Sequence, residues 1–198
     1  MTVKILLAVI LGIISGYFYA PEIIVENING VIDFGLCLLL FFVGIDIGRN
    51  KNILNDIKKY GYKIILIPFM IVLGTIVGSI LSSFILKIPV FEAAAVGSGL
   101  GWYSLSAIEL SKYSTELGTL AFLSNILREV IAIIAMPFIA TNIGHMETIA
   151  AAGATSMDTS LPIITKATNS SMSVIAFFSG LVLSTLVPIL LPLMMSFI

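Results

Sequence analysis

Apolar stretches of 18 to 26 residues follow one another along nearly the whole chain, separated by short runs that contain proline, glycine or charged residues. About 20 apolar residues in an α-helix cross the hydrocarbon core of a bilayer. We therefore predict an all-α integral membrane protein that forms a single transmembrane domain over residues 1–198. Its seven hydrophobic segments lie approximately at residues 3–20, 30–48, 62–86, 90–111, 117–141, 146–165 and 172–197.

The composition supports a membrane protein in the lipid bilayer and argues against other classes. Hydrophobic residues make up 59% of the chain and charged residues only 11%, whereas soluble domains carry about 25% charged residues. The net charge of −1 argues against a nucleic-acid partner. Because Cys37 and His145 are the only residues of their types, we expect no internal disulfide, no cofactor and no metal site.

The charged loop between the second and third segments predicts the orientation. It holds half of the ten Lys and Arg residues, and basic loops stay on the cytoplasmic side. This places the N-terminus in the cytoplasm and the C-terminus outside. The apolar run after Lys4 is similar to a signal peptide, but Phe18-Tyr19-Ala20 lacks the small residues of a cleavage site, so we expect a retained helix. The basic residues of the loop are Arg49, Lys51, Lys58, Lys59 and Lys63.

Two segments differ from the others because polar or glycine-rich runs interrupt them. Segment 90–111 contains GSGLGWYSLS, and glycine weakens a helix by about 1 kcal/mol relative to alanine. Segment 146–165 contains GATSMDTSLP, which ends at the helix-breaking Pro162. Paired interruptions of this kind point to the binding site of a transporter, where half-helix ends offer free backbone groups. We predict broken or re-entrant helices in a transport core at 90–165, with backbone sites at Gly97, Gly99, Gly101 and Gly153. The alternative is that the second run is partly a surface loop.

A charged pair, Arg128 and Glu129, lies near the middle of segment 117–141. A charge at the bilayer centre costs about 2.5–3.5 kcal/mol on insertion scales, so neither side chain should face lipid. Asn125 precedes the pair by three and four residues and shares one polar face with it. We expect Arg128 to face Asp158 or the C-terminus of a half-helix, which leaves Glu129 for a cation or a proton. The alternative is a charge network that only fixes the register of the helices.

Hydroxyl groups around Asp158 indicate a cation site. Their oxygens can coordinate a cation or accept hydrogen bonds from an ammonium group. Trp102 and Tyr103 either wall a binding pocket or belong to an interfacial aromatic belt. Glu109 has Lys112 three residues ahead as a local ion-pair partner. The hydroxyl candidates for the site are Ser104, Thr155, Ser156 and Thr159.

No catalytic pattern accompanies these residues, so we do not expect an enzyme. The sequence has no Ser-His-Asp arrangement, no nucleotide-binding loop and no Gly-x-Ser-x-Gly elbow. Asp46 and Asp158 lack the motifs of an intramembrane aspartyl protease.

Several motifs, in this order over nearly the whole chain, resemble the lysine exporter LysO family. They are FFVGIDIG (41–48), GSGLGWYSLS, NILREV (125–130), GATSMDTSLP and a closing helix with LSTLVPIL (183–190). The resemblance implies a secondary active transporter of the bacterial inner membrane that exports L-lysine and its analogue thialysine. It also implies that functional intramembrane carboxylates correspond to Glu129 and Asp158.

This chain departs from the family pattern in one respect. Family members are commonly longer, with an earlier hairpin that resembles residues 1–48 before the part matched here. We expect a separately encoded small membrane subunit to supply that part and to restore the internal repeat common in transporter folds. The alternatives are a homo-oligomer and a chain that works alone.

Lysine fits the charges of these residues. Glu129 and Asp158 are expected to receive ammonium groups, and a half-helix N-terminus or Arg128 the carboxylate. Moving a cation out of the cell costs about 2.3 kcal/mol per charge per 100 mV, so export requires coupling. Our hypothesis is proton antiport through Glu129. The alternatives are a channel or holin-like pore, a subunit that only scaffolds a partner, and a transporter of another solute such as an organic anion or sodium with a carboxylate.

Overall fold

The computed structural model describes residues 2–18, 63–198 and the isolated positions 21, 27, 30, 34–35, 37–38, 41–42, 45 and 61. Helices, turns and short connections account for these residues, and no strand occurs among them. The predicted all-α class is therefore confirmed. Most of segment 30–48 and of the basic loop 49–63 lies outside the described residues, so the count of seven segments and the hairpin at 1–48 stay predictions.

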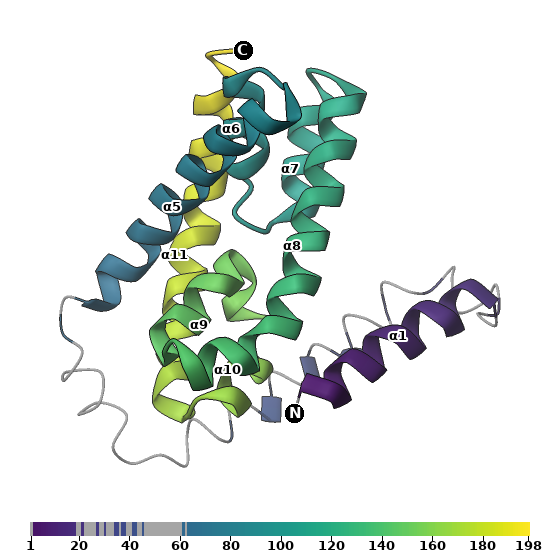
Figure 1. The fold of residues 1–198 in the computed structure, drawn as a ribbon, viewed down its shortest axis with the longest axis vertical. Coiled ribbons are helices and arrows are strands. Elements are labelled where there is room, and N and C mark those ends of the chain that lie inside the picture. The colour runs from purple at the N-terminus through teal and green to yellow at the C-terminus, as the bar shows by residue number, and fades with distance from the viewer. Residues whose placement is uncertain are drawn as a thin grey trace.

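Three long helices run along the long axis of the bundle (Figure 1). They are α5 (Lys63–Leu86), α8 (Thr115–Asn142) and α11 (Ser170–Met195). Each contains an apolar stretch long enough to cross a membrane. Side-chain caps begin two of them, because Ser114 Oγ accepts the Leu117 N–H and Asn169 Oδ1 accepts the Met172 N–H. A further helix, α1 (Thr2–Phe18), contacts α8.

Segment 90–111 forms a hairpin of two short helices. It divides into α6 (Val90–Gly97) and α7 (Tyr103–Ser111), which are about 12 and 14 Å long at 1.5 Å per residue. Neither is long enough to cross a bilayer of about 30 Å. In Figure 1 both outer ends of the hairpin lie where α5 ends and α8 begins, while the connection between α6 and α7 lies half-way down the bundle.

Segment 146–165 forms a second hairpin at the opposite end of the bundle (Figure 1). It consists of α9 (His145–Ala152), the 3₁₀ turn η1 (Gly153–Met157) and α10 (Leu161–Ala167). The chain enters it from the end of α8 and leaves it to begin α11.

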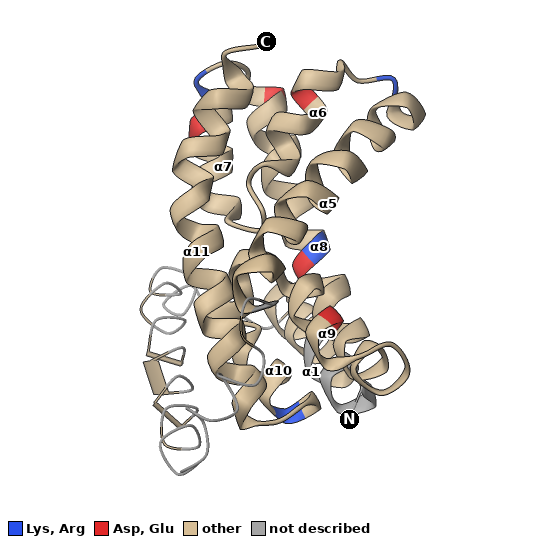
Figure 2. Cartoon of the chain, turned by 90° about the vertical axis from the view of Figure 1, so that its left-hand side faces the viewer, with Lys and Arg blue, Asp and Glu red and all other residues tan. Residues whose placement is uncertain are grey.

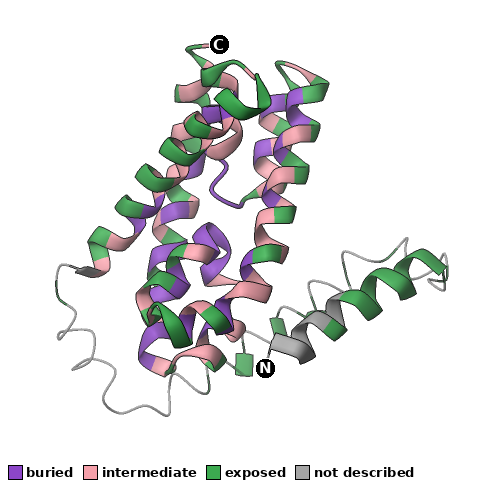
Figure 3. Cartoon of the chain, viewed as in Figure 1, coloured by how far each residue is buried: buried purple, intermediate pink, exposed green. Residues whose placement is uncertain are grey.

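The tips of the two hairpins meet inside the bundle. The Ala154 N–H donates to the Leu100 carbonyl at 3.0 Å, and both residues are nearly inaccessible. Figure 3 shows buried residues concentrated at these tips, whereas much of the outer surface of the long helices is exposed. Gly180 of α11 permits the close approach of η1, because a Cβ there would lie 2.6 Å from the Met157 nitrogen. The hairpin tips therefore form a buried and closely packed centre of the bundle.

Candidate functional site

Arg128 lies at the midpoint of α8, as the fourteenth of its 28 residues, and binds the end of a short helix. Its Nη1 donates to the carbonyls of Ala151 and Ala152 at 3.0 and 3.1 Å. These carbonyls belong to the C-terminus of α9, which carries partial negative charge. Of the two partners expected for Arg128, the structure thus shows the half-helix C-terminus. The charged residues coloured in Figure 2 lie mostly towards the two ends of the bundle, and α8 carries a pair half-way along.

Asn125, one turn earlier on α8, binds the other hairpin. Its Oδ1 accepts the Gly101 N–H at 2.8 Å, and its Nδ2 donates to the Val96 carbonyl near the end of α6 at 3.4 Å. Nδ2 also donates to the Ala121 carbonyl at 2.9 Å. Two side chains of one helix face therefore hold both hairpin tips. The Gly101 N–H, expected to be free for a ligand, is instead taken by Asn125.

The glycines of the tips leave room for these side chains. Gly101 has φ +109°, and a Cβ there would lie 1.9 Å from Arg128 Nη2. Gly153 has φ +63°, and its Cβ would lie 2.6 Å from the Leu100 carbonyl oxygen. At Gly99 and Gly97, the added Cβ would meet Ser106 and Ser79, at 2.8 and 1.9 Å. The four glycines predicted as backbone binding sites thus lie at close contacts, and a direct role in binding stays a prediction.

Two carboxylates converge on one hydroxyl group. The Thr159 hydroxyl donates to Glu129 Oε1 and lies 3.3 Å from Asp158 Oδ1. The Thr159 N–H donates to the same Asp158 oxygen at 2.6 Å. Among the described residues, the one ion pair within 4 Å joins Lys112 to Glu109 at 2.6 Å, which confirms that local pairing. Glu129 and Asp158 are therefore linked to each other through Thr159, and within the described part of the chain neither has a basic side chain within 4 Å.

A cavity of about 230 Å³ opens between the two hairpin tips. The start of α7 forms one wall, the turn after η1 forms another, and α11 contributes a serine. We refer to it as the central cavity. It is lined by Gly101, Trp102, Tyr103, Ser104, Ala154, Thr155, Met157, Asp158, Thr159 and Ser184.

Comparison with known proteins identifies the family. The family model for lysine exporter LysO matches residues 6–195. The chain belongs to the lysine exporter LysO family. Lysine exporter LysO of Escherichia coli is 35% identical over 162 residues, which are 80% of this chain and 53% of the relative. A Haemophilus influenzae protein named "Putative lysine exporter" is 31% identical over 197 residues, 98% of each chain. No solved structure matches the chain.

The chain thus spans about half the length of the E. coli LysO relative and nearly the full length of the H. influenzae one. The family is one of transporters embedded in the membrane, which agrees with the predicted class of protein. Among the described residues, three helices are long and apolar enough to cross a membrane, which also agrees with this family.

Six of the side chains predicted for the site of this LysO family member line the central cavity together. Trp102 and Tyr103 lie there instead of at an end of the bundle, and the Tyr103 ring packs edge-on against Phe122 at 5.7 Å. Ser156 lies elsewhere, because its hydroxyl is fully buried and donates to the Ala176 carbonyl at 2.9 Å. The six are Trp102, Tyr103, Ser104, Thr155, Asp158 and Thr159.

The structure also adds residues that sequence reasoning missed. Met157 and Ser184 line the central cavity, and the Ser184 hydroxyl lies 3.7 Å from the Met157 sulfur. Gly180 lies under η1. Ser184 and Gly180 belong to α11, which reads as a plain apolar helix, so only the small and hydroxyl residues within that apolar sequence could have indicated them.

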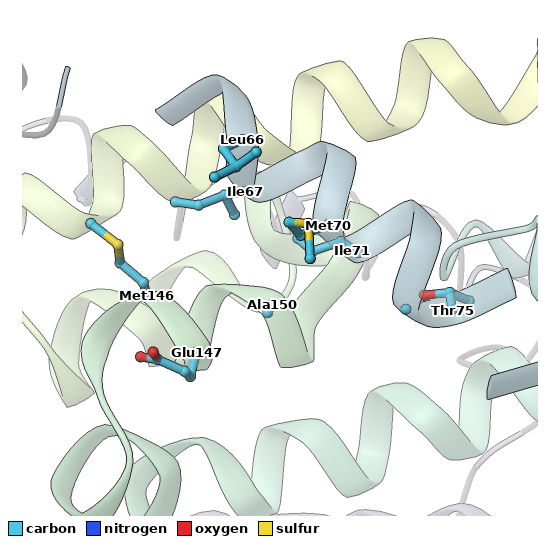
Figure 4. A pocket seen from close by; sticks show the side chains of 9 residues that line it. Leu66, Ile67, Met70, Ile71, Thr75, Met146, Glu147 and Ala150 are labelled. Atoms are coloured by element: carbon cyan, nitrogen blue, oxygen red, sulfur yellow. The ribbon is translucent and has the colours of Figure 1, made fainter. Parts of the chain in front are cut away.

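A larger cavity of about 500 Å³ lies between α5 and α9 (Figure 4). Its lining is mostly apolar, with Leu66, Met70 and Met146 among the side chains and Glu147 as the one charged residue. Leu66 and Met70 are about half exposed, as expected of side chains that face lipid. This cavity contains none of the predicted site residues, so we place the candidate site in the central cavity.

Proposed function

We propose that this protein exports L-lysine across the bacterial inner membrane by proton antiport, with the central cavity as its substrate site. The observation that carries the proposal is the pair of carboxylates, Glu129 and Asp158, joined by the Thr159 hydroxyl beside that cavity. The name of the E. coli relative supports lysine as the substrate. Thialysine, which differs little from lysine in shape and charge, would follow the same route.

In the proposed binding mode, lysine occupies the central cavity and its side-chain ammonium binds the Asp158 carboxylate. That carboxylate lines the cavity, whereas Glu129 lies behind Thr159 and does not line it. The lysine carboxylate would lie at the start of α7, where Trp102 provides no side-chain cap and Ser104 lines the same cavity. A helix N-terminus favours an anion. Arg128 is the weaker candidate for this carboxylate, because it already binds the end of α9 and lines other cavities.

The Thr159 hydroxyl gives a physical route for coupling a proton to lysine. A hydroxyl has a single hydrogen to donate, and here Glu129 accepts it. When Glu129 takes up a proton it becomes a donor itself, and the Thr159 hydrogen is free to turn to Asp158. That hydrogen bond would weaken the hold of Asp158 on the ammonium. Proton uptake at Glu129 would therefore favour release of lysine.

We further propose that the hairpins enter the membrane from opposite sides. If the basic loop 49–63 is cytoplasmic, α5 begins inside, and both the α6–α7 hairpin and the C-terminus lie towards the outside. The α9–α10 hairpin would then enter from the cytoplasm. Residues 90–165 would form the transport core.

We also propose a partner for this chain, either a separately encoded small membrane subunit or a second copy of the chain. Co-purification of the tagged chain from its native membrane, followed by mass spectrometry and mass photometry, distinguishes a hetero-complex, a homo-oligomer and a monomer.

The proposal is tested by counterflow of labelled lysine in proteoliposomes that contain the purified protein. We expect saturable counterflow and efflux driven by an imposed pH gradient. Glu129→Gln should retain counterflow but lose the response to the gradient, while Glu109→Gln, in the exposed pair with Lys112, serves as the matched control. Unchanged proton-coupled efflux in Glu129→Gln would exclude antiport through this residue.

The same assay separates the rival functions. A channel or holin-like pore would show neither saturation nor counterflow. A subunit that only scaffolds a partner would lose assembly, and not flux, when Asp158 or Glu129 is neutralised. An exporter of another solute, such as an organic anion, would leave labelled lysine untransported.

A further inference from the structure

Among the described residues, Ser184 is the one residue of α11 that lines the central cavity. It lies four residues beyond Gly180 on the same face of the helix, which is about 6 Å along the axis. Gly180 packs against η1 of the second hairpin, and α11 continues from there towards the outer end of the first hairpin (Figure 1). Ser184 therefore lies on the first-hairpin side of η1, with its side chain partly exposed.

The Ser184 hydroxyl has no strong hydrogen-bond partner within the described part of the chain. It donates to the Met157 sulfur, with 3.7 Å between oxygen and sulfur, and a thioether sulfur is a weak acceptor. The next residue shows the usual arrangement, because the Thr185 hydroxyl donates to the Val182 carbonyl of its own helix at 2.8 Å. Ser184 can therefore give its hydrogen to a stronger acceptor that enters the cavity.

The charges of the central cavity suit the ammonium groups of lysine better than its carboxylate. Asp158 supplies a negative charge, but no Lys, Arg or His is among the described residues that line the cavity. A bound carboxylate must therefore be held by neutral donors, which are hydroxyl groups and the N–H groups at the start of α7. Each of these donors matters, because a hydrogen bond to a charged group is worth more than a neutral one.

Helix α11 packs on the first hairpin at the level of Ser184. It contacts α7, and Leu183 shares a buried cluster with Leu100 of the hairpin tip and Leu110 of α7. Leu105, in the first turn of α7, packs against the same cluster. A carboxylate at the start of α7 therefore faces the α11 wall of the same cavity, which Ser184 forms.

We propose that Ser184 determines the specificity of the central cavity for α-amino acids, by donating a hydrogen bond from its hydroxyl to the substrate carboxylate. The carboxylate replaces the Met157 sulfur as the acceptor. The inference rests on the proposed function, in which lysine binds this cavity with its carboxylate at the start of α7. A diamine that has the ammonium groups of lysine but no carboxylate leaves Ser184 with its weak partner, so it binds less tightly than lysine.

Competition against counterflow of labelled lysine in proteoliposomes that contain the full chain tests the proposal. The competitors are unlabelled L-lysine and cadaverine, the diamine that is lysine without its carboxylate. We expect the wild type to prefer lysine. Ser184→Ala should raise the inhibition constant of lysine about tenfold and leave that of cadaverine nearly unchanged, so that the preference for lysine falls about tenfold.

Three further variants make the test specific to the hydroxyl. Ser184→Thr keeps the hydroxyl and should keep the preference for lysine. Ser184→Cys carries a weaker donor, so its preference should lie between those of the wild type and Ser184→Ala, and it provides the test if the alanine variant does not fold. Thr185→Val is the matched control, because the Thr185 hydroxyl binds its own helix and does not line the cavity.

The outcomes separate this inference from the proposed function. A preference that Ser184→Ala leaves unchanged, or an equal weakening of lysine and cadaverine, overturns the role of Ser184. Lysine counterflow that still depends on Asp158 would then support the substrate site without it. Equal losses of preference in Ser184→Ala and Thr185→Val also overturn the role, because they would come from the packing of α11. Absence of lysine counterflow in the wild type would overturn the proposed function, and this inference with it.

Discussion

The two hairpins that meet at the centre of the bundle are built alike but hold different chemistry. In each, a short helix ends at the centre, and a polar side chain of α8 binds its last carbonyls. At α6 the donor is the neutral Asn125, at a long 3.4 Å, and the tip consists mainly of glycine and the buried Leu100. At α9 the donor is the cationic Arg128, and the tip carries hydroxyl groups and Asp158. The first hairpin thus contributes close fit, and the second contributes charge.

The largest expected difference lies between the two α8 side chains. Arg128→Ala should lower the free energy of unfolding by about 3 kcal/mol, because it removes two charge-assisted hydrogen bonds. Asn125→Ala should cost about 1 kcal/mol, the value of neutral hydrogen bonds. Chemical unfolding in mixed micelles, followed by circular dichroism, measures both. Equal losses would mean that the positive charge of Arg128 adds nothing to its binding of the end of α9. Partial recovery of stability in Arg128→Lys would confirm that this charge contributes.

The next largest loss of stability is expected when a side chain is added at the closely packed tip of the first hairpin. Gly101→Ala should cost about 2 kcal/mol of stability, from its left-handed backbone conformation and its contact with Arg128. Gly74→Ala on α5 is the matched control, because a Cβ there has no atom within 4 Å. Thermal unfolding of the two variants compares them directly. Gly153→Ala extends the test to the second hairpin. It should lower the stability about as much as Gly101→Ala does if both tips require close packing without a side chain.

Removing the charge of the second tip should have a smaller effect than the changes above, and the effect should be on transport and not on the free energy of unfolding. Asp158→Asn keeps the shape of the side chain and removes its charge. We expect lysine counterflow to fall about tenfold, equivalent to about 1.4 kcal/mol, with the unfolding free energy nearly unchanged. A loss of stability comparable to that of Gly101→Ala would remove the distinction between the two hairpins.

The smallest effect is expected at the hydroxyl that joins the carboxylates. Thr159→Val preserves the side-chain shape but removes the hydrogen bond to Glu129. Hydrogen bonds inside membrane bundles average about 0.6 kcal/mol, so transport should fall about threefold. The pH dependence of efflux should also flatten, and Thr159→Ser should restore it. An unchanged pH dependence in Thr159→Val would exclude the hydroxyl from coupling.

Much of this arrangement could be predicted from the sequence, because a membrane protein needs long apolar helices and the interruptions of those helices stand out. Apolar run length predicted the three long helices, and glycine and proline marked both interruptions. The polar face of α8 predicted that Asn125, Arg128 and Glu129 act together. Spacing alone could not choose between the two partners of Arg128, because that depends on how α9 approaches α8 in space. It also could not identify Ser184 or Gly180, whose importance comes from the packing of η1 on α11.

The hydrogen bonds of Arg128 have a consequence for how the protein is made. The carbonyls that it binds lie 23 and 24 residues further along the chain. Because α8 precedes α9 in the chain, its central charge meets these carbonyls only when the second hairpin has joined the bundle. A charge at the bilayer centre costs about 2.5–3.5 kcal/mol on insertion scales, so we expect a chain truncated before α9 to insert α8 less completely than the full chain does.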